Sequence, residues 1–425
     1  LPGELIEFSL SGSLESKNRI YWDLSLPRGD DENTSDFNHL LTATDELEEL
    51  LLDVLSKESI SDVSLGSFLS GGIDSSLITA LLQRVSSSAI ETFSIGYEED
   101  SHNEAPYASK IATHLGTQHN ELILSAKDLI DTIPSLQSLF DEPFGDSSSV
   151  PTYLVSKFAK TKLTVCLSGD GGDELFGGYS RYQRANALWG NINSIPFPLR
   201  RLTNMPFNLL SKYETNSELY QKFIKALEYL NCNSLEECYE LQLKFTNTEM
   251  GYFTNISEIN SSIPNFQELN LYKNMMYRDL KLYLPDDILT KVDRAAMSNS
   301  LETRAPFLHH KVVEFASHLP VKMKTDGITG KIILRELLSR YVPRELFERP
   351  KMGFGIPINH WLRNDLKGWA TDLLNKENLE RSGLLKSHLI QRRLEEHLEG
   401  KRNWDYFLWR ILMFIDWQEI NLNNN

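Results

Sequence analysis

Short apolar runs and amphipathic segments alternate along the first half of the chain. Four of the runs have the length and composition of buried strands, and they cover residues 63–69, 89–95, 121–124 and 163–167. Between the runs, apolar residues recur every three or four positions, for example over 105–115 and 128–140, as expected for one face of a helix. Strands that alternate with helices predict an α/β fold with a doubly wound parallel sheet.

The pattern differs on either side of this region. Before it, we expect two short strands followed by a polar segment at 29–36. After it, helical spacing dominates, and the clearest helices are expected over 387–398 and 407–420. The sequence therefore predicts three zones, namely a leading segment over residues 1–40, a sheet-containing core over 41–190 and a mainly helical part over 191–425.

Composition narrows the class of protein. The chain has 425 residues, of which 43 are basic and 59 acidic, and its net charge of −16 makes it a poor binder of nucleic acid. No apolar run reaches the roughly 18 residues of a membrane span, so no membrane association is expected. The three cysteines include no C-x-x-C pair, which disfavours a disulfide framework and a zinc ribbon. They suit a reducing compartment, and we expect a cytoplasmic protein.

A glycine- and serine-rich loop, SGGIDSS at residues 70–76, lies between the first predicted strand and a predicted helix. Its glycines let the backbone approach an anion closely, and its N–H and hydroxyl groups can donate to phosphate oxygens. The loop has no lysine, and Asp74 would repel a phosphate unless a divalent cation lay between them. The loop therefore predicts a site for a Mg²⁺-bound phosphate group. The residues predicted to bind it are Ser70, Gly71, Gly72, Asp74, Ser75 and Ser76.

A second loop of this kind, LSGDGGDELFGGY at residues 167–179, follows the fourth predicted strand. The carboxyl ends of parallel strands meet at one edge of a sheet, so the two loops are expected side by side if their strands are neighbours. Two carboxylates from different loops hold Mg²⁺ better than one, and we predict Asp74 and Asp173 as the metal pair. A Ca²⁺ loop or a solvated turn is the alternative, although EF-hand spacing is absent.

The SGGIDSS loop resembles the signature of the ATP pyrophosphatase superfamily. The LSGDGGDELFGGY loop that follows it resembles the second signature of two members of that superfamily, the asparagine synthetases and the related β-lactam synthetases. Further segments resemble the same family pattern, at residues 19–24, 141–146, 293–308, 330–336 and 351–357. The resemblance covers nearly the whole chain. It implies a sheet of the adenine nucleotide alpha hydrolase type and a synthetase domain that occupies residues 41–425.

The resemblance implies an AMP-forming carbon–nitrogen ligase of the asparagine synthase (glutamine-hydrolysing) type. In that reaction the side-chain carboxylate of aspartate attacks the α-phosphate of ATP, which releases pyrophosphate and leaves an aspartyl adenylate. Ammonia then displaces AMP and gives asparagine. ATP, aspartate and ammonia are therefore the expected substrates, and Mg²⁺ is the expected cofactor.

The resemblance also implies roles for individual residues. Lys331, by its place in the family motif, is the candidate cation for the charge that develops on the α-phosphate. Glu302 and Arg304 are either part of the acid–base machinery or a structural ion pair. Asp170 stands where the family often has Glu, and we treat it as a catalytic candidate. Its side chain is one methylene shorter than Glu, so the identity of the acceptor carboxylate stays open. The residues expected to line the nucleotide pocket are Leu69, Ile95, Ser168 and Gly169.

Members of this family carry an N-terminal glutaminase domain whose first residue is a nucleophilic cysteine. The cysteines here are Cys166, Cys232 and Cys238, none near position 1. We therefore interpret residues 1–40 as a linker or remnant that follows a glutaminase domain in a longer native protein. The chain as given is expected to use free ammonia.

Other functions stay open at this point. One is a related amidotransferase or lactam-forming synthetase that acts on another carboxylate, for example in polysaccharide biosynthesis. Another is a catalytically silent nucleotide-binding protein. A sulfur-transferring tRNA enzyme is disfavoured by the acidic charge and by the absence of a cysteine pair. The sequence does not fix the oligomeric state, and a homodimer is one alternative.

Overall fold

The computed structural model describes residues 2–9, 15–24, 37–99, 103–202, 218–243, 251–254, 271–349 and 355–422. The polar segment expected at 29–36, and most of the motif at 351–357, lie outside the described residues. Among the described residues, no helix has the length and apolarity that a membrane span requires.

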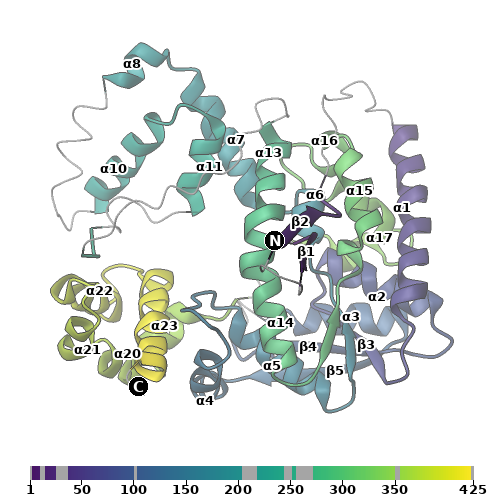
Figure 1. Ribbon diagram of the computed structural model, residues 1–425, viewed down its shortest axis with the longest axis horizontal. Coiled ribbons are helices and arrows are strands. Elements are labelled where there is room, and N and C mark those ends of the chain that lie inside the picture. Colours follow the sequence, from purple (N-terminus) through teal and green to yellow (C-terminus); the bar gives the residue numbers. More distant parts are fainter. Residues whose placement is uncertain are drawn as a thin grey trace.

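A five-stranded parallel sheet, in the order β5-β4-β3-β6-β7, lies at the centre of the molecule (Figure 1). The strands are β3 (Leu65–Phe68), β4 (Glu91–Tyr97), β5 (Gln118–Leu124), β6 (Val165–Leu167) and β7 (Glu302–Arg304). The α/β fold and its four predicted strands are confirmed. The strand order reverses direction between β3 and β6, and ligands of such sheets bind where that reversal occurs, outside the carboxyl ends of the strands.

Helices cover both faces of the sheet, because its strand residues point alternately to the two sides. In β6, Val165 and Leu167 belong to one buried apolar cluster, while Cys166 belongs to the other. The first cluster includes side chains from α1 (Phe37–Glu58), α2 (Ile73–Val85), α3 (Ala105–Leu115), α15 (His310–His318), α17 (Ile332–Leu338) and α18 (Arg344–Phe347). The second includes side chains from α4 (Ala126–Gln137) and α5 (Ser149–Lys160). The sheet is therefore doubly wound, as predicted.

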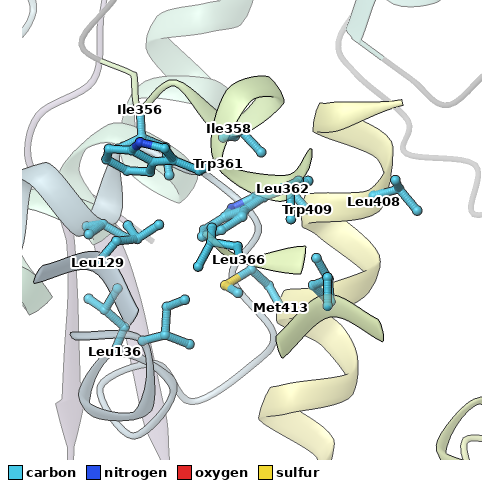
Figure 2. Close-up of a cluster of buried hydrophobic side chains, with 14 of the residues drawn as sticks. Leu129, Leu136, Ile356, Ile358, Trp361, Leu362, Leu366, Leu408, Trp409 and Met413 are labelled. Carbon is cyan, nitrogen blue, oxygen red and sulfur yellow. The ribbon is translucent and has the colours of Figure 1, made fainter. Parts of the chain in front are cut away.

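The C-terminal helices complete the second cluster. They are α19 (Ile358–Arg363), α20 (Lys367–Leu373), α21 (Lys376–Arg381), α22 (Ser387–Leu398) and α23 (Asp405–Leu422), and the last two confirm the helices predicted there. Figure 2 shows Trp361 of α19 and Trp409 of α23 near Leu129 and Leu136 of α4. Both indole side chains are almost completely buried. The sheet and the C-terminal helices thus share one hydrophobic core.

The remaining elements flank these layers. The helices α7 (Ser180–Asn193), α8 (Phe197–Arg201), α10 (Glu218–Leu230) and α11 (Leu235–Leu243) lie at the upper left of Figure 1. The helices α13 (Leu271–Arg278) and α14 (Thr290–Met297), which the π-helix η1 (Asp279–Leu289) connects, lie in the middle of the view. Short helices are α6 (Gly172–Phe176), η2 (Pro306–Leu308) and α16 (Val321–Lys324). The two predicted N-terminal strands form an antiparallel hairpin, β1 (Glu4–Phe8) and β2 (Ser16–Ile20).

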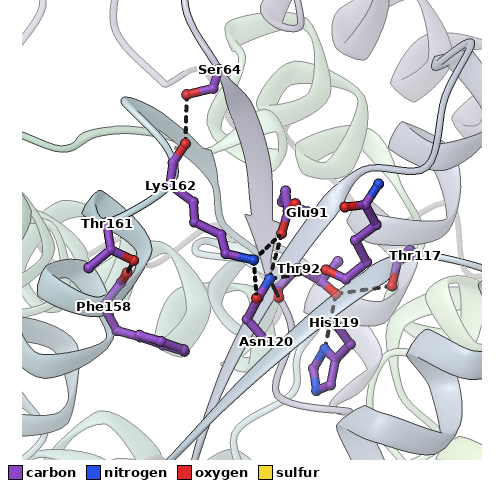
Figure 3. Close-up of polar contacts among 10 residues, drawn as sticks. Ser64, Glu91, Thr92, Thr117, His119, Asn120, Phe158, Thr161 and Lys162 are labelled. Carbon is purple, nitrogen blue, oxygen red and sulfur yellow. Dashed lines mark hydrogen bonds and ion pairs between the residues drawn. The ribbon is translucent and has the colours of Figure 1, made fainter.

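Polar contacts tie the strands together at the amino edge of the sheet (Figure 3). The Asn120 side-chain amide donates to Glu91 Oε2 at 2.6 Å, and Lys162 Nζ donates to Asn120 Oδ1 at 2.7 Å. Ser64, just before β3, donates its hydroxyl to the carbonyl of Lys162 at 2.9 Å. These bonds join β4, β5 and the segments that precede β3 and β6. They fix the strands at the edge opposite the glycine-rich loops.

His397, at the end of α22, gives the fold a testable pH dependence. The side chain is fully buried, and its Nδ1 accepts a hydrogen bond from the Trp404 backbone N–H at 3.0 Å. Burial, reinforced by the charge of Arg363, lowers the pKa of His397 from 6.5 to about 4. Between these values the unfolded chain binds a proton that the folded chain does not, so stability falls as the pH drops from 6.5 toward 4.

The variant H397Q cannot bind that proton, so its free energy of unfolding is expected to fall less than the wild type's between pH 7 and pH 5. Urea unfolding at both pH values measures the difference. The matched control is H388Q, because His388 lies on the same helix and is exposed. A pH dependence that is the same in H397Q and H388Q would contradict the prediction.

Candidate functional site

The two predicted glycine-rich loops lie against each other at the carboxyl edge of the sheet. Their strands are hydrogen-bonded neighbours, with Ser67 of β3 opposite Leu167 of β6. A Cβ atom added at Gly169 would lie 2.8 Å from the Ser75 nitrogen, and one added at Gly172 would lie 2.5 Å from Asp74 Oδ1. Such contacts are too short for a side chain, so glycine at these positions allows the close approach of the two loops.

Internal hydrogen bonds shape the SGGIDSS loop. The Ser70 and Ser75 hydroxyls are 3.0 Å apart, and the Gly72 N–H donates to Ser70 Oγ at 3.2 Å. Gly71 has φ = +75°, a conformation that residues with a Cβ rarely adopt. Ser76 is fully buried behind the loop. The bend directs the loop into the N-terminus of α2, which is favourable for an anion.

Lys331 joins the two loops. Its Nζ forms an ion pair with Asp74 and lies 2.7 Å from Asp173 Oδ1. Burial alone would lower the pKa of Lys331, but the charges of Asp173 and Asp74 raise it above its usual value, so the side chain stays protonated. Its backbone adopts the left-handed conformation, with φ = +60°, and its N–H donates to the Phe176 carbonyl at 3.1 Å. The loop that follows β6 thus positions the lysine directly.

The structure brings most of the predicted residues to this edge. Leu69 and Ile95 lie there with buried side chains, on opposite faces of the sheet. The polar residues that meet around the two loops are Ser70, Gly71, Gly72, Asp74, Ser75, Ser168, Gly169, Asp173 and Lys331. Their roles in binding and catalysis stay predictions.

Glu302 does not join this group. It begins β7 opposite Val165, the first residue of β6, and therefore lies at the amino edge of the sheet. Its carboxylate accepts a hydrogen bond from Arg304 Nε at 2.7 Å, and Arg304 also donates to the carbonyls of Glu58 and Ile60. These contacts favour the structural ion pair over the acid–base role.

Asp170 lies half-buried on the second loop. Burial raises the pKa of its carboxyl group, and the charge of Asp173 adds to the effect, against the charge of Lys291. Lys291 is a buried cation that donates to Asp146 Oδ2 at 2.8 Å and to Ser148 Oγ at 2.7 Å. A second polar cluster therefore lies close to Asp170.

This second cluster was not predicted from the sequence. It contains Lys291 of α14, Asp146 of the 141–146 motif and Asp287 of η1. Burial, followed by the charge of Asp146, raises the pKa of Asp287 to about 7. The family segment at 141–146 drew attention to Asp146, but nothing in the sequence pattern connected it with Asp287 and Lys291.

Asp74 and Asp173 fit a magnesium ion. Both carboxylates contact the same Lys331 nitrogen, so they lie close enough to share one cation. Mg²⁺ is held in proteins by one or two carboxylates together with phosphate and water oxygens. Among the described residues, no group of three or more His, Cys, Asp or Glu side chains could hold a metal. A Mg²⁺ ion held by this pair would take its other ligands from phosphate and water oxygens.

The parallel sheet and the paired loops at its switch point are consistent with an α/β nucleotide-binding fold. The chain belongs to the asparagine synthase family, whose sequence profile matches residues 46–419. This confirms the resemblance inferred from the motifs.

Named relatives agree with this assignment. The chain is 31% identical over 395 residues to asparagine synthetase (glutamine-hydrolyzing) 1 of Bacillus subtilis, covering 89% of this chain and 59% of that protein. It is 33% identical over 385 residues to a putative asparagine synthetase (glutamine-hydrolyzing) of Mycobacterium tuberculosis, covering 88% of this chain and 57% of that protein. The chain thus spans less than two thirds of the length of these relatives.

Proposed function

We propose that this chain is the synthetase part of an ATP-dependent amide ligase that converts aspartate to asparagine. The observation that carries the proposal is the Lys331 side chain, held between Asp74 and Asp173 where the two glycine-rich loops meet. A cation fixed beside phosphate-binding loops suits a reaction in which charge builds on a phosphate group.

In the first step the aspartate side-chain carboxylate attacks the α-phosphorus of ATP, and the bond to the β-phosphate breaks. The N–H and hydroxyl groups of the SGGIDSS loop hold the departing pyrophosphate, while the Lys331 ammonium stabilises charge on the phosphate oxygens. Asp74 and Asp173 would hold Mg²⁺, which neutralises phosphate charge. The chain also orients the reacting groups. The glycines that let the two loops meet bring the SGGIDSS donors, Lys331 and the two carboxylates to one place.

In the second step ammonia attacks the activated carbonyl carbon, and AMP leaves. The attacking nitrogen must lose a proton, and we assign this proton to Asp170, which lies on the loop that follows β6 and has a carboxyl pKa raised by burial. The relatives are named as glutamine-hydrolysing, and we propose that a glutaminase domain supplies the ammonia in the full-length protein. We further propose a cytoplasmic location.

A second candidate is a ligase of the same kind that acts on a different carboxylate. The observation that favours it is Asp170, which stands where the family often has Glu and reaches one methylene less far into the site. The products distinguish the two candidates.

The test is product analysis with ATP, Mg²⁺, aspartate and either ammonia or glutamine. We expect AMP, pyrophosphate and asparagine with ammonia alone. The variant D74N is the control for a contaminating ligase, because it removes a carboxylate from the site. AMP formation that requires another carboxylate favours the second candidate, whereas ADP and phosphate as products contradict both.

A further inference from the structure

The Arg349 side chain packs against the first turn of α3, although the two are far apart in the sequence. It follows α18, whose Phe347 is buried in the same apolar cluster as Ala108 and Ile111 of α3. Arg349 Nη2 lies 2.9 Å from Glu104 Oε1, and the guanidinium carbon lies 4.3 Å from the centre of the Tyr107 ring. Packing, an ion pair and a stacked ring therefore fix the guanidinium group in place.

Two of the Arg349 donors have no acceptor in the part of the chain that the structure describes. Arg349 Nε and Nη1 are buried, and neither has a hydrogen-bond partner among the described residues. The guanidinium carbon lies over the Tyr107 ring, and the carbon atoms of that ring offer no oxygen acceptor to these N–H bonds. Buried donors without a partner are rare in folded proteins, and here they belong to a permanent cation. A ligand with oxygen acceptors and negative charge would satisfy them.

The phosphate loop is adjacent. A Cβ atom at Gly71 would lie 3.1 Å from Tyr107 Cβ and 2.9 Å from the Ala108 nitrogen, so SGGIDSS touches the turn on which Arg349 rests. The N-terminus of α3 follows β4 and lies at the carboxyl edge of the sheet, as SGGIDSS does. Arg349 and the loop that the proposed function assigns to pyrophosphate thus contact the same turn, around Tyr107.

We propose that Arg349 is a phosphate-binding residue whose Nε and Nη1 donate to oxygens of the β- and γ-phosphates of ATP, while Nη2 stays paired with Glu104. The proposal rests on the proposed function only in placing a nucleotide at SGGIDSS. It assigns Glu104 and Tyr107 to the positioning of Arg349. A lysine at this position would keep the charge but could not hold Glu104 and two phosphate oxygens in one plane.

The test compares ligands with and without the terminal phosphates. Calorimetry with the full chain measures the binding of pyrophosphate, ATP and AMP to the wild type, R349A and R349K. We expect R349A to weaken pyrophosphate and ATP binding by about tenfold or more and R349K by less, with AMP binding unchanged, because charge-assisted hydrogen bonds are lost only to the terminal phosphates. The matched control is R344A, an exposed arginine on the neighbouring helix that should change none of the three.

Removal of Arg349 takes this cation away from the Glu104 carboxylate, which could disturb the local fold. The double variant R349A/E104Q also removes the carboxylate charge, so it separates an effect on ligand binding from a local folding defect. It should show the same selective loss as R349A. Unchanged pyrophosphate binding in R349A, or an equal loss for AMP, overturns the proposal. If the selective loss occurs but the wild type never forms AMP from any acceptor, the phosphate site stands and the proposed function fails.

Discussion

Replacement of Lys331 by methionine (K331M) is expected to lower the rate of AMP formation by about 10³-fold, which is the upper range for losing one group that stabilises transition-state charge. Methionine keeps much of the length of the side chain and removes its charge. Asp74 and Asp173 then face each other without their shared cation and repel the incoming phosphates. The rate of AMP release at saturating ATP and acceptor measures the effect.

The matched control is K322M, because Lys322 lies exposed on α16, a short distance earlier in the chain. It should retain full activity. The variant K331R keeps the charge on a longer and planar group and should recover part of the rate. Activity in K331M within tenfold of the wild type would exclude Lys331 as the stabilising cation.

Replacement of Gly178 by alanine (G178A) is expected to lower the rate of AMP formation by roughly 10²-fold. A Cβ atom at this position would overlap with Asp173 Oδ1 and with Lys331 Cε. One added methyl group therefore forces apart the ion pair that joins the two loops. A misplacement of about 1 Å in an active site can cost roughly 10²-fold in rate. The rate of AMP release and the thermal unfolding temperature should be measured together.

The control for G178A is G190A. Gly190 lies on α7, where an added Cβ would meet no atom within 4 Å, and alanine should be tolerated there or should stabilise the helix slightly. If G178A is as active as G190A, the close packing around Asp173 and Lys331 is not required for function.

Much of the sheet could be predicted because buried parallel strands are continuous apolar runs. The fifth strand, β7, consists of Glu302, Thr303 and Arg304 and has no such run, so only its pairing with β6 identifies it. The helices of the C-terminal part were predictable where apolar residues recur every four positions, as in α22.

The site was predictable only in part. The two glycine-rich loops carry a local signal, but the Lys331–Asp74 ion pair joins residues 257 positions apart. Lys331 was identified from the family motif and not from the residue pattern. The same resemblance also identified Glu302, although that residue lies at the other edge of the sheet. Lys291 was missed because a lysine on a helix normally faces solvent, and only the fold reveals its burial.

The shared hydrophobic core has a consequence for how this chain can be divided. Phe93 and Ile95 of β4 belong to the same buried cluster as Trp361 and Trp409 of the C-terminal helices. A fragment that ends before α19 would expose the apolar side chains of this cluster that the C-terminal helices cover, among them Leu129 and Leu136 of α4. The C-terminal helices are therefore not a detachable module, and evolution or an engineer could exchange them only together with the strand residues that they cover.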